Sequence, residues 1–288
     1  MKHKEKDRPT TSGETFPGAP AAVQRTAQQA HHLRFLDEPQ DIAESIGWTI
    51  PESVGSTIWP MTTSGLLIGR WENAWELLNG LPRTGLFETM VSRYTDPRRH
   101  YHTLAHLAEC FGAFDKLSHH CDHPMEVEMA IWFHDAIYDP VRLDNELRSS
   151  ELAFSSLTES GIELLCASRI AKLVIATDHR RPPASVDAGI LVDVDLAILG
   201  ADKERFRQYE SQIRWEYGYL SDEAYLRGRM QFVARLLKKF KSGGHIYCTP
   251  EFRRDLEPRA VANLQASLKR MRAGLLPARM PMMKSGEK

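Results

Sequence analysis

Histidine and aspartate side chains occur at three places in this chain where the surrounding pattern calls for apolar packing residues. His134 and Asp135 stand back to back in the otherwise apolar run 130–138. His106 ends an upstream cluster, and Asp195 lies in a downstream apolar run. Burying an imidazole and a carboxylate is unfavourable unless something compensates, and a cation is a natural compensation. The order His, His-Asp, Asp therefore predicts a metal site assembled from three helices.

The spacing of these residues limits where an ion can bind. His102 and His106 are four positions apart, so on a helix they share a face. His134 and Asp135 are adjacent and diverge by about 100° on a helix, so both reach one ion only over a bent helix end. Two imidazoles and two carboxylates with water in the remaining positions suit Mn, Fe, Co, Ni or Zn better than Mg. Such open positions are typical of catalytic rather than structural sites.

Each of these residues also has a plainer interpretation. A single histidine on a helix is more often solvated or capping than a ligand, because histidine is only intermediate in burial. Asp193 or Asp195 alone can cap a helix. The ordered set, with each member inside an apolar helical pattern, favours the metal site over these alternatives.

The composition is that of an ordinary globular protein. The 288 residues are 42% hydrophobic and 26% charged, and the formal net charge is -1. That charge gives no field to attract nucleic acid or an anionic membrane, and no stretch approaches the roughly 20 apolar residues of a membrane span. The cysteine spacing matches neither a zinc ribbon nor a disulfide framework, so we expect a reduced cytoplasmic protein in which Cys110 and Cys166 are small core residues.

Helical periodicity runs through the chain from Leu66 onward and predicts an all-α fold. Leu67, Trp71 and Trp75 recur at a spacing of four and form one apolar stripe. Asp96-Pro97 and Ser242-Gly243-Gly244 predict breaks. We expect helices at 67–78, 84–94, 102–117, 125–135, 144–156, 163–177, 186–199, 203–217, 222–240 and 258–273.

The ends of the chain differ in composition from its middle. Residues 1–60 are rich in Pro, Thr, Ser, Ala and Gly, which predicts a flexible N-terminal tail with one short helix at 23–35. Residues 61–276 are expected to form a single helical domain, and residues 277–288 a frayed C-terminus. Nothing in the sequence specifies an oligomeric state.

Four motifs in this chain resemble those of the HD superfamily of metal-dependent phosphohydrolases, and in particular a bacterial branch of it. They are Tyr-His-x-x-x-His, Trp-Phe-His-Asp-Ala-x-Tyr-Asp-Pro, Asp-Asn-Glu-x-x-Ser and Asp-x-Asp-Leu-x-Ile-Leu-Gly, at 101–106, 132–140, 144–149 and 193–200. The resemblance covers about residues 66–271. It implies a single HD-type helical domain whose metal ligands are His106, His134, Asp135 and Asp195.

The first motif is also similar to the Tyr-His-Asn-x-x-His of cyclic-nucleotide phosphodiesterases. That similarity implies that His106 is a ligand and that His102 is the general acid. The final aspartate of the superfamily matches Asp195 better than Asp193. Two-metal members often carry a His-Glu pair after the HD helix, whereas this chain has Asn145-Glu146 there. One divalent ion per chain is therefore expected.

The resemblance implies hydrolysis of a phosphoester or phosphoanhydride in a small phosphorylated substrate, with a nucleotide as the expected class. A bound divalent ion would lower the pKa of a water and polarise a phosphoryl oxygen. Asp135 or Glu146 would orient the water, and His102 would protonate the leaving oxygen. The expected substrate-binding residues are cationic or ring side chains near the motifs, although each arginine alone is more often a surface charge: Arg98, Arg99, Tyr138, His179, Arg214 and Arg229.

Two other functions remain open at this stage. Some HD-type folds oxygenate substrates at a di-iron centre, but Asn145 in place of a bridging histidine disfavours that chemistry. A non-catalytic sensor that binds metal or nucleotide is the other alternative. The full ligand set and the presence of His102 disfavour a sensor.

Overall fold

Every regular element in the computed structural model is a helix, within residues 61–277, which are the residues that the structure describes. The predicted all-α class is therefore confirmed for this part of the chain. The predictions for residues 1–60 and 278–288, including the short helix at 23–35, lie outside the described residues. The chain divides into the units Met1–Leu66 and Leu67–Lys288, and the description below concerns the second.

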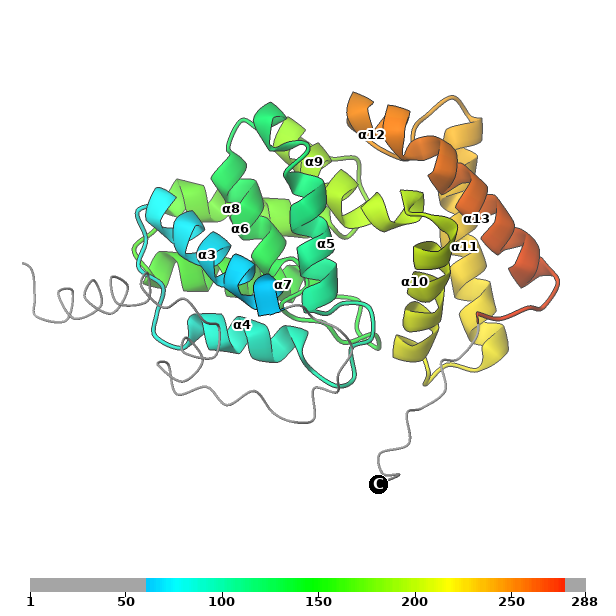
Figure 1. The fold of residues 1–288 in the computed structure, drawn as a ribbon, viewed down its shortest axis with the longest axis horizontal. Helices are drawn as coiled ribbons and strands as arrows, with labels where there is room; N and C mark the ends of the chain where they lie inside the picture. The colour runs from blue at the N-terminus through cyan, green and yellow to red at the C-terminus, as the bar shows by residue number, and fades with distance from the viewer. Residues whose placement is uncertain (1–60, 278–288) are drawn as a thin grey trace, which may run out of the picture. The chain divides into compact units, whose positions relative to one another are not determined.

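Each predicted helix has a counterpart in the structure (Figure 1). The α-helices and two short 3-10 helices are α3 (Met61–Leu77), α4 (Leu86–Tyr94), α5 (Leu104–Phe114), η1 (Ser118–His120), α6 (Pro124–Phe133), α7 (Asn145–Glu159), α8 (Leu164–Ala176), α9 (Val186–Asp195), η2 (Leu196–Gly200), α10 (Lys203–Glu216), α11 (Asp222–Lys241), α12 (Pro250–Asp255) and α13 (Glu257–Arg272). None of the described helices is both long and apolar enough to cross a membrane.

Helix α6 lies at the centre of the core. All of its residues from Glu126 to Phe133 are buried, and the two buried glutamates, Glu126 and Glu128, pair with Arg169 and Arg70. It contacts α5, α7, α8 and α9. An aromatic cluster packs on one flank, where Trp71 lies 5.1 Å from Trp132 between ring centroids. This burial fixes the C-terminal end of α6, where the His-Asp pair lies.

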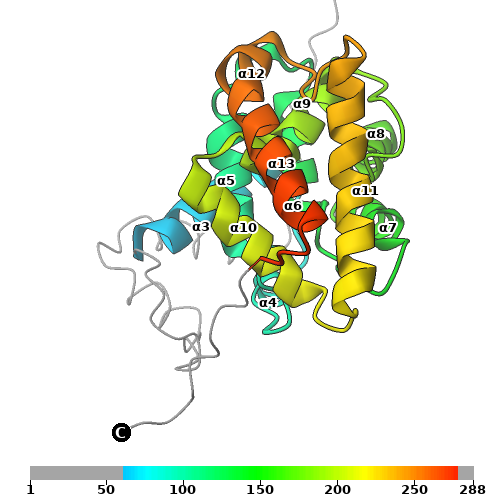
Figure 2. The same ribbon diagram turned by 90° about the vertical axis from the view of Figure 1, so that its right-hand side faces the viewer.

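A second group of helices follows the core in the chain. Figures 1 and 2 show α10, α11 and α13 packed side by side beyond α9, and η2 contacts both α10 and α13. Gly200 at the end of η2 meets α13 closely, because a Cβ there would lie 2.6 Å from Cβ of Leu256. The approach of these backbones brings α10 and α11 to the side of the core that carries the predicted metal ligands.

Three differences from the sequence prediction affect whole elements or the candidate site. The expected helix at 102–117 begins only at Leu104, the expected helix at 186–199 divides into α9 and η2, and α12 was not predicted. At the first of these, the hydroxyl of Thr103 accepts a hydrogen bond from the backbone of Ala105 at 3.3 Å and caps α5. His102 consequently precedes the helix. The prediction that it shares a helical face with His106 is wrong.

Candidate metal centre and cavity

The end of α6 presents the His-Asp pair. The helix ends at Phe133, His134 is its C-cap residue, and Asp135 follows directly. The guanidinium of Arg99 donates to the carbonyl oxygens of Asp135 and Ala136 at 2.7 and 3.2 Å, which supplies partners for carbonyls left free at the helix end. The two side chains therefore project from a helix terminus, as the adjacency of the pair requires.

Four side chains from α5, α9 and the end of α6 converge on one point. Nε2 of His106 lies 3.1 Å from Nε2 of His134, 3.6 Å from Oδ2 of Asp135 and 3.3 Å from Oδ1 of Asp195. Nε2 of His134 lies 3.1 Å from Oδ2 of Asp135 and 3.8 Å from Oδ1 of Asp195. An ion at about 2.0–2.2 Å from each atom would set neighbouring ligand atoms about 2.8–3.6 Å apart. The donor set therefore fits a single divalent cation, with only the longest separation slightly wide.

Neighbouring groups orient two of these ligands. Nδ1 of His134 lies 2.8 Å from the carbonyl oxygen of Ile131 and donates to it, so Nε2 is the nitrogen that faces the cluster. Nε2 of His179 lies 2.8 Å from Oδ2 of Asp195, which leaves Oδ1 facing His106. Such outer partners are typical of metal-ligating side chains.

The electrostatics of the cluster reflect opposite charges in a buried space. Burial alone would raise the pKa of Asp135 and Asp195, but the surrounding histidines outweigh it and hold both pKa values below their ordinary range. Burial alone would lower the pKa of His134, but Asp135 and Asp195 outweigh it and raise that pKa to about 9. Protons and a cation therefore compete for the same carboxylates and imidazoles.

Cys110 is a further candidate ligand that the sequence suggested only as a core residue. Its sulfur and the ligand atoms of His106, His134 and Asp195 all lie within 4.8 Å of one another. The sulfur is 3.7 Å from Nδ1 and 3.6 Å from Nε2 of His106. Near-equal distances to both nitrogens place it beside the ring rather than in line with either lone pair. Burial, its largest influence, raises the pKa of the thiol well above its ordinary value, which disfavours the ligating thiolate.

Asp193 and Asp195 have different partners, which resolves the choice between them. The carboxylate of Asp193 is fully buried and accepts hydrogen bonds from the backbone of Cys248 and Thr249 at 2.6 and 2.7 Å. The hydroxyl of Thr249 also donates to it at 2.6 Å. Asp193 thus holds the loop before α12, whereas Asp195 faces the histidines.

His102 stands beside the ligands and is held by Glu216. Nδ1 of His102 lies 2.7 Å from Oε2 of Glu216, and the hydroxyl of Tyr138 donates to the same oxygen at 2.9 Å. The Tyr138 and His102 rings lie 4.1 Å apart between centroids. Burial would lower the pKa of His102, but the carboxylates of Glu216 and Asp135 outweigh it and raise the pKa. With Nδ1 engaged, Nε2 is the nitrogen free to exchange a proton.

Sequence reasoning did not single out Glu216. The residue lies in the Ile-Arg-Trp-Glu-Tyr segment at the end of the predicted helix 203–217, where aromatic and charged side chains alternate. Acidic residues at helix ends are normally solvated, so that segment alone does not distinguish Glu216 from a surface residue. Its side chain has no exposed surface in the structure.

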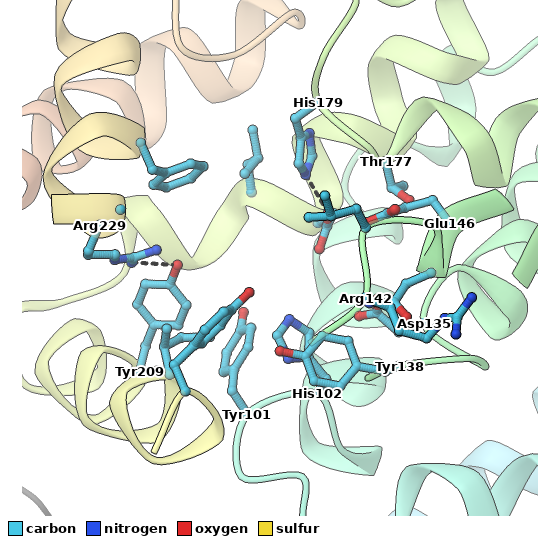
Figure 3. Close-up of a pocket in the computed structure, with 18 of the residues that line it drawn as sticks. Tyr101, His102, Asp135, Tyr138, Arg142, Glu146, Thr177, His179, Tyr209 and Arg229 are labelled. Carbon is cyan, nitrogen blue, oxygen red and sulfur yellow. Dashed lines mark hydrogen bonds and ion pairs between the residues drawn. The ribbon is translucent and has the colours of Figure 1, made fainter. Parts of the chain in front are cut away.

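His102, Asp135, Tyr138 and Asp195 line a cavity of about 450 Å³. Figure 3 shows Asp135, Glu146 and Thr177 on one side, Tyr101, His102 and Tyr138 along the middle, and the Tyr209–Arg229 pair at the opposite side. Burial, the largest influence on Glu146, raises the pKa of its carboxyl. The Glu146 carboxyl and the His102 imidazole therefore line the same cavity as Asp135 and Asp195 of the candidate metal cluster.

Asn145 cannot serve as a ligand in the conformation observed. Its Nδ2 donates to the carbonyl oxygen of Asp139 at 2.8 Å, and its Oδ1 accepts from the backbone N–H of Asp139 at 3.1 Å. Both ends of the amide thus clamp the loop after the His-Asp pair.

The predicted substrate-binding residues divide into two sets. Tyr138, His179 and Arg229 line the cavity. Arg98 and Arg214 do not: the exposed Arg98 pairs with Asp96, and the buried Arg214 pairs with Asp222.

Arg99 also lies outside the residues that line the cavity. Its guanidinium donates to the backbone carbonyls of His102, Asp135 and Ala136. The structure therefore corrects the predicted substrate-binding set by removing Arg98, Arg99 and Arg214, because their guanidinium groups already have protein partners away from the cavity.

Comparison with known proteins adds no relative: no protein-family model, curated protein or solved structure matches this chain.

Proposed function

We propose that this protein is a metal-dependent phosphohydrolase that acts on a small phosphorylated molecule, with a nucleotide as the expected class. One observation carries the proposal: the side chains of His106, His134, Asp135 and Asp195 lie at ion-binding separations, and two of them, Asp135 and Asp195, line a cavity that His102 also lines. The resemblance of the four sequence motifs to HD phosphohydrolases supports the same reaction type. The nucleotide class rests on that resemblance alone.

The donor set determines which cations suit the centre. Two imidazole nitrogens and two carboxylates favour Mn, Fe, Co, Ni or Zn over Mg. When bound, such an ion supplies Lewis-acid chemistry, lowering the pKa of a water and polarising a phosphoryl oxygen. A di-iron oxygenase would need a further ligand near position 145, where the Asn145 amide is occupied by the backbone of Asp139.

The protein's own residues supply the remaining chemistry. The raised pKa of His102 favours its protonated form, which can donate a proton from Nε2 to the leaving oxygen. Glu216 fixes the ring through Nδ1 and stabilises its protonated form. Glu146 lines the same end of the cavity and can accept a hydrogen bond from the attacking water.

A turnover screen tests this function. The metal-free protein is loaded with Mn, Ni, Zn or Mg, and release of phosphate or alcohol is followed with p-nitrophenyl phosphate, bis-p-nitrophenyl phosphate and a panel of nucleotides. We expect hydrolysis that requires a transition metal and disappears in Asp195→Asn. Leu143→Ala, which alters an exposed residue of the cavity mouth, is the matched control. Metal binding with no turnover of any phosphoester would instead favour the sensor.

A further inference from the structure

The end of the cavity opposite the metal ligands has a distinct chemistry. We call it the distal subsite and define it by the lining residues Tyr209, Tyr225, Arg229 and Phe232, together with Tyr101 at its inner edge. The Tyr101 ring lies 4.7 Å, between centroids, from the rings of both Tyr209 and His106. Tyr209 belongs to α10, and Tyr225, Arg229 and Phe232 belong to α11. Figure 3 shows the labelled pair Tyr209 and Arg229 across the cavity from His179 and Glu146.

Arg229 forms no ion pair among the described residues, although the carboxylate of Glu210 acts on its charge from beyond ion-pair distance. Its Nη2 donates to the hydroxyl of Tyr209 at 2.7 Å, and its guanidinium carbon lies 5.0 and 4.9 Å from the ring centroids of Tyr209 and Phe232. Among the described residues, none of the ion pairs includes Arg229, and Glu210 on the neighbouring helix pairs with Arg270 instead. Stacking on two rings stabilises the cation only in part, since a desolvated charge calls for an opposite charge.

Three donors at this end of the cavity have no acceptor. They are Nε of Arg229 and the hydroxyls of Tyr101 and Tyr225, each buried and without a hydrogen-bond partner. Tyr101 is 4% exposed and Tyr225 is 3% exposed, so bulk water does not satisfy them. Buried donors are nearly always paired in folded proteins, and an unpaired one costs free energy. Donors in excess, together with a positive charge, indicate an anionic acceptor.

We propose that the distal subsite binds a second anionic group, a phosphate or carboxylate, of the substrate whose phosphoryl group lies at the metal ligands. This inference rests on the proposed function and narrows the substrate class to phosphorylated compounds that carry a second, separate anionic group. Arg229 pairs with the second anion, and the hydroxyls of Tyr101 and Tyr225 donate to it. The rings of Tyr101, Tyr209 and Phe232 leave room for an apolar or ring-shaped spacer between the two groups.

A binding test isolates the distal subsite from catalysis. Metal is stripped with a chelator, the chelator is removed, and the melting temperature is measured with inorganic phosphate, acetate or chloride at constant ionic strength. We expect phosphate or acetate to raise the melting temperature of the wild type and of Arg235→Gln. Arg235 is the matched control because it is exposed on α11 and also contacts Phe232. Arg229→Gln should lose that shift, and an equal shift in Arg229→Gln would overturn the proposal.

Tyr225→Phe is a second variant, and a different change in melting temperature is expected for it. The hydroxyl has no partner in the structure, so its removal should raise the melting temperature of the anion-free protein. The same change should reduce the anion-induced shift, because one donor to the anion is gone. A variant whose anion response equals that of the wild type contradicts the assigned role of the hydroxyl. Phosphate and acetate responses together show which anion the subsite prefers.

Turnover of matched substrate pairs tests the metal ligands and the distal subsite together. With Mn bound, kcat/KM is compared for adenosine 3',5'-bisphosphate and adenosine 5'-monophosphate, and for 3-phosphoglycerate and glycerol 3-phosphate. Because a charge-assisted contact forms only with the second anionic group, we expect kcat/KM to be roughly 10- to 100-fold higher for the compound with two anionic groups in at least one pair. Arg229→Gln should bring that ratio close to one, and Arg235→Gln should leave it unchanged. A wild type that prefers neither doubly anionic compound overturns the inference.

Failure of the two proposals can be told apart. If the wild type hydrolyses no phosphoester with any metal, the proposed function fails, while the metal-free anion shift still decides whether Arg229 binds an anion. If hydrolysis occurs but phosphate and acetate leave the melting temperature unchanged, the function holds and the distal subsite does not.

Discussion

The carboxylate of Glu216 and the imidazole of His102, 114 positions apart in the chain, meet at 2.7 Å between Oε2 and Nδ1. The other carboxylate oxygen, Oε1, accepts the backbone N–H groups of His100, Tyr101 and His102 at 2.8, 2.8 and 3.0 Å. One side chain at the end of α10 therefore holds both the backbone before α5 and the ring of His102. The backbone of residues 100–102 is thereby held directly before the start of α5.

Glu216→Gln should lower stability in a pH-dependent manner. Burial would raise the pKa of Glu216, but His102 and the backbone donors outweigh it and lower the pKa to about 2 from an ordinary 4.5. A carboxyl with a depressed folded pKa contributes stability above its unfolded value, and the contribution is lost as the pH falls from 4.5 toward 2. A difference of this size corresponds to roughly 3 kcal/mol at neutral pH. Urea unfolding at pH 7 and pH 3 should show a deficit that shrinks on acidification.

Glu204→Gln is the control for that measurement, because Glu204 is an exposed acid in the first turn of the same helix. It should change the free energy of unfolding by no more than about 0.5 kcal/mol at either pH. A deficit in Glu216→Gln that stays constant between pH 7 and pH 3 would show that the ionised carboxylate is not the stabilising species.

His102→Ala and His106→Ala should separate proton donation from metal binding. His102→Ala removes the proposed donor and should lower turnover by about 10²–10⁴-fold while metal content stays near normal. His106→Ala removes a ligand and should empty the centre, with activity lost as a consequence. Metal analysis of both purified proteins beside their turnover is the measurement. The reverse pattern, an empty centre in His102→Ala and a filled one in His106→Ala, would exchange the two roles.

Metal should stabilise the fold. Asp135 and Asp195 both contact His106 and His134, so an ion there would draw together residues from α5, α9 and the end of α6. Binding at a free concentration 100 times the dissociation constant adds about 2.7 kcal/mol. The melting temperature should rise with Mn or Ni and fall again on chelation. The same scan on Asp195→Asn serves as the control, and an unchanged wild-type curve under both treatments would contradict a tight site.

The sequence predicted the helices well because their apolar stripes are long and periodic. The stripe of Leu67, Trp71 and Trp75 is buried in the core, as its spacing requires. Boundaries were less predictable, since they depend on contacts distant in sequence. Thr103 caps the start of α5, and the backbone directly before it is held by Glu216, which belongs to a helix about a hundred positions later.

The residues of the candidate site were likewise only partly predictable from the sequence. Ligand-type residues in apolar surroundings stand out in a sequence, because burying them needs compensation. Arginines do not stand out, since a buried and an exposed arginine occupy similar patterns. Arg99 and Arg214 were expected to face the substrate, and the structure shows them bound to backbone carbonyls and to Asp222. Only the three-dimensional arrangement distinguishes these from Arg229.

Cys110 provides the last test, because it lies close enough to the cluster to compete with Asp135 for the role of ligand. The sulfur lies beside the His106 ring, and burial raises the pKa of the thiol. Asp135, by contrast, has a carboxylate oxygen 3.1 Å from Nε2 of His134 and a lowered pKa. Cys110→Ala should therefore retain metal at the wild-type ratio, and Asp135→Asn should lose it. With Co bound, the absorption spectrum of the wild type should lack a thiolate-to-metal charge-transfer band. Loss of metal in Cys110→Ala, with retention in Asp135→Asn, would instead assign a His2CysAsp centre, and thiolate ligation would then favour Zn.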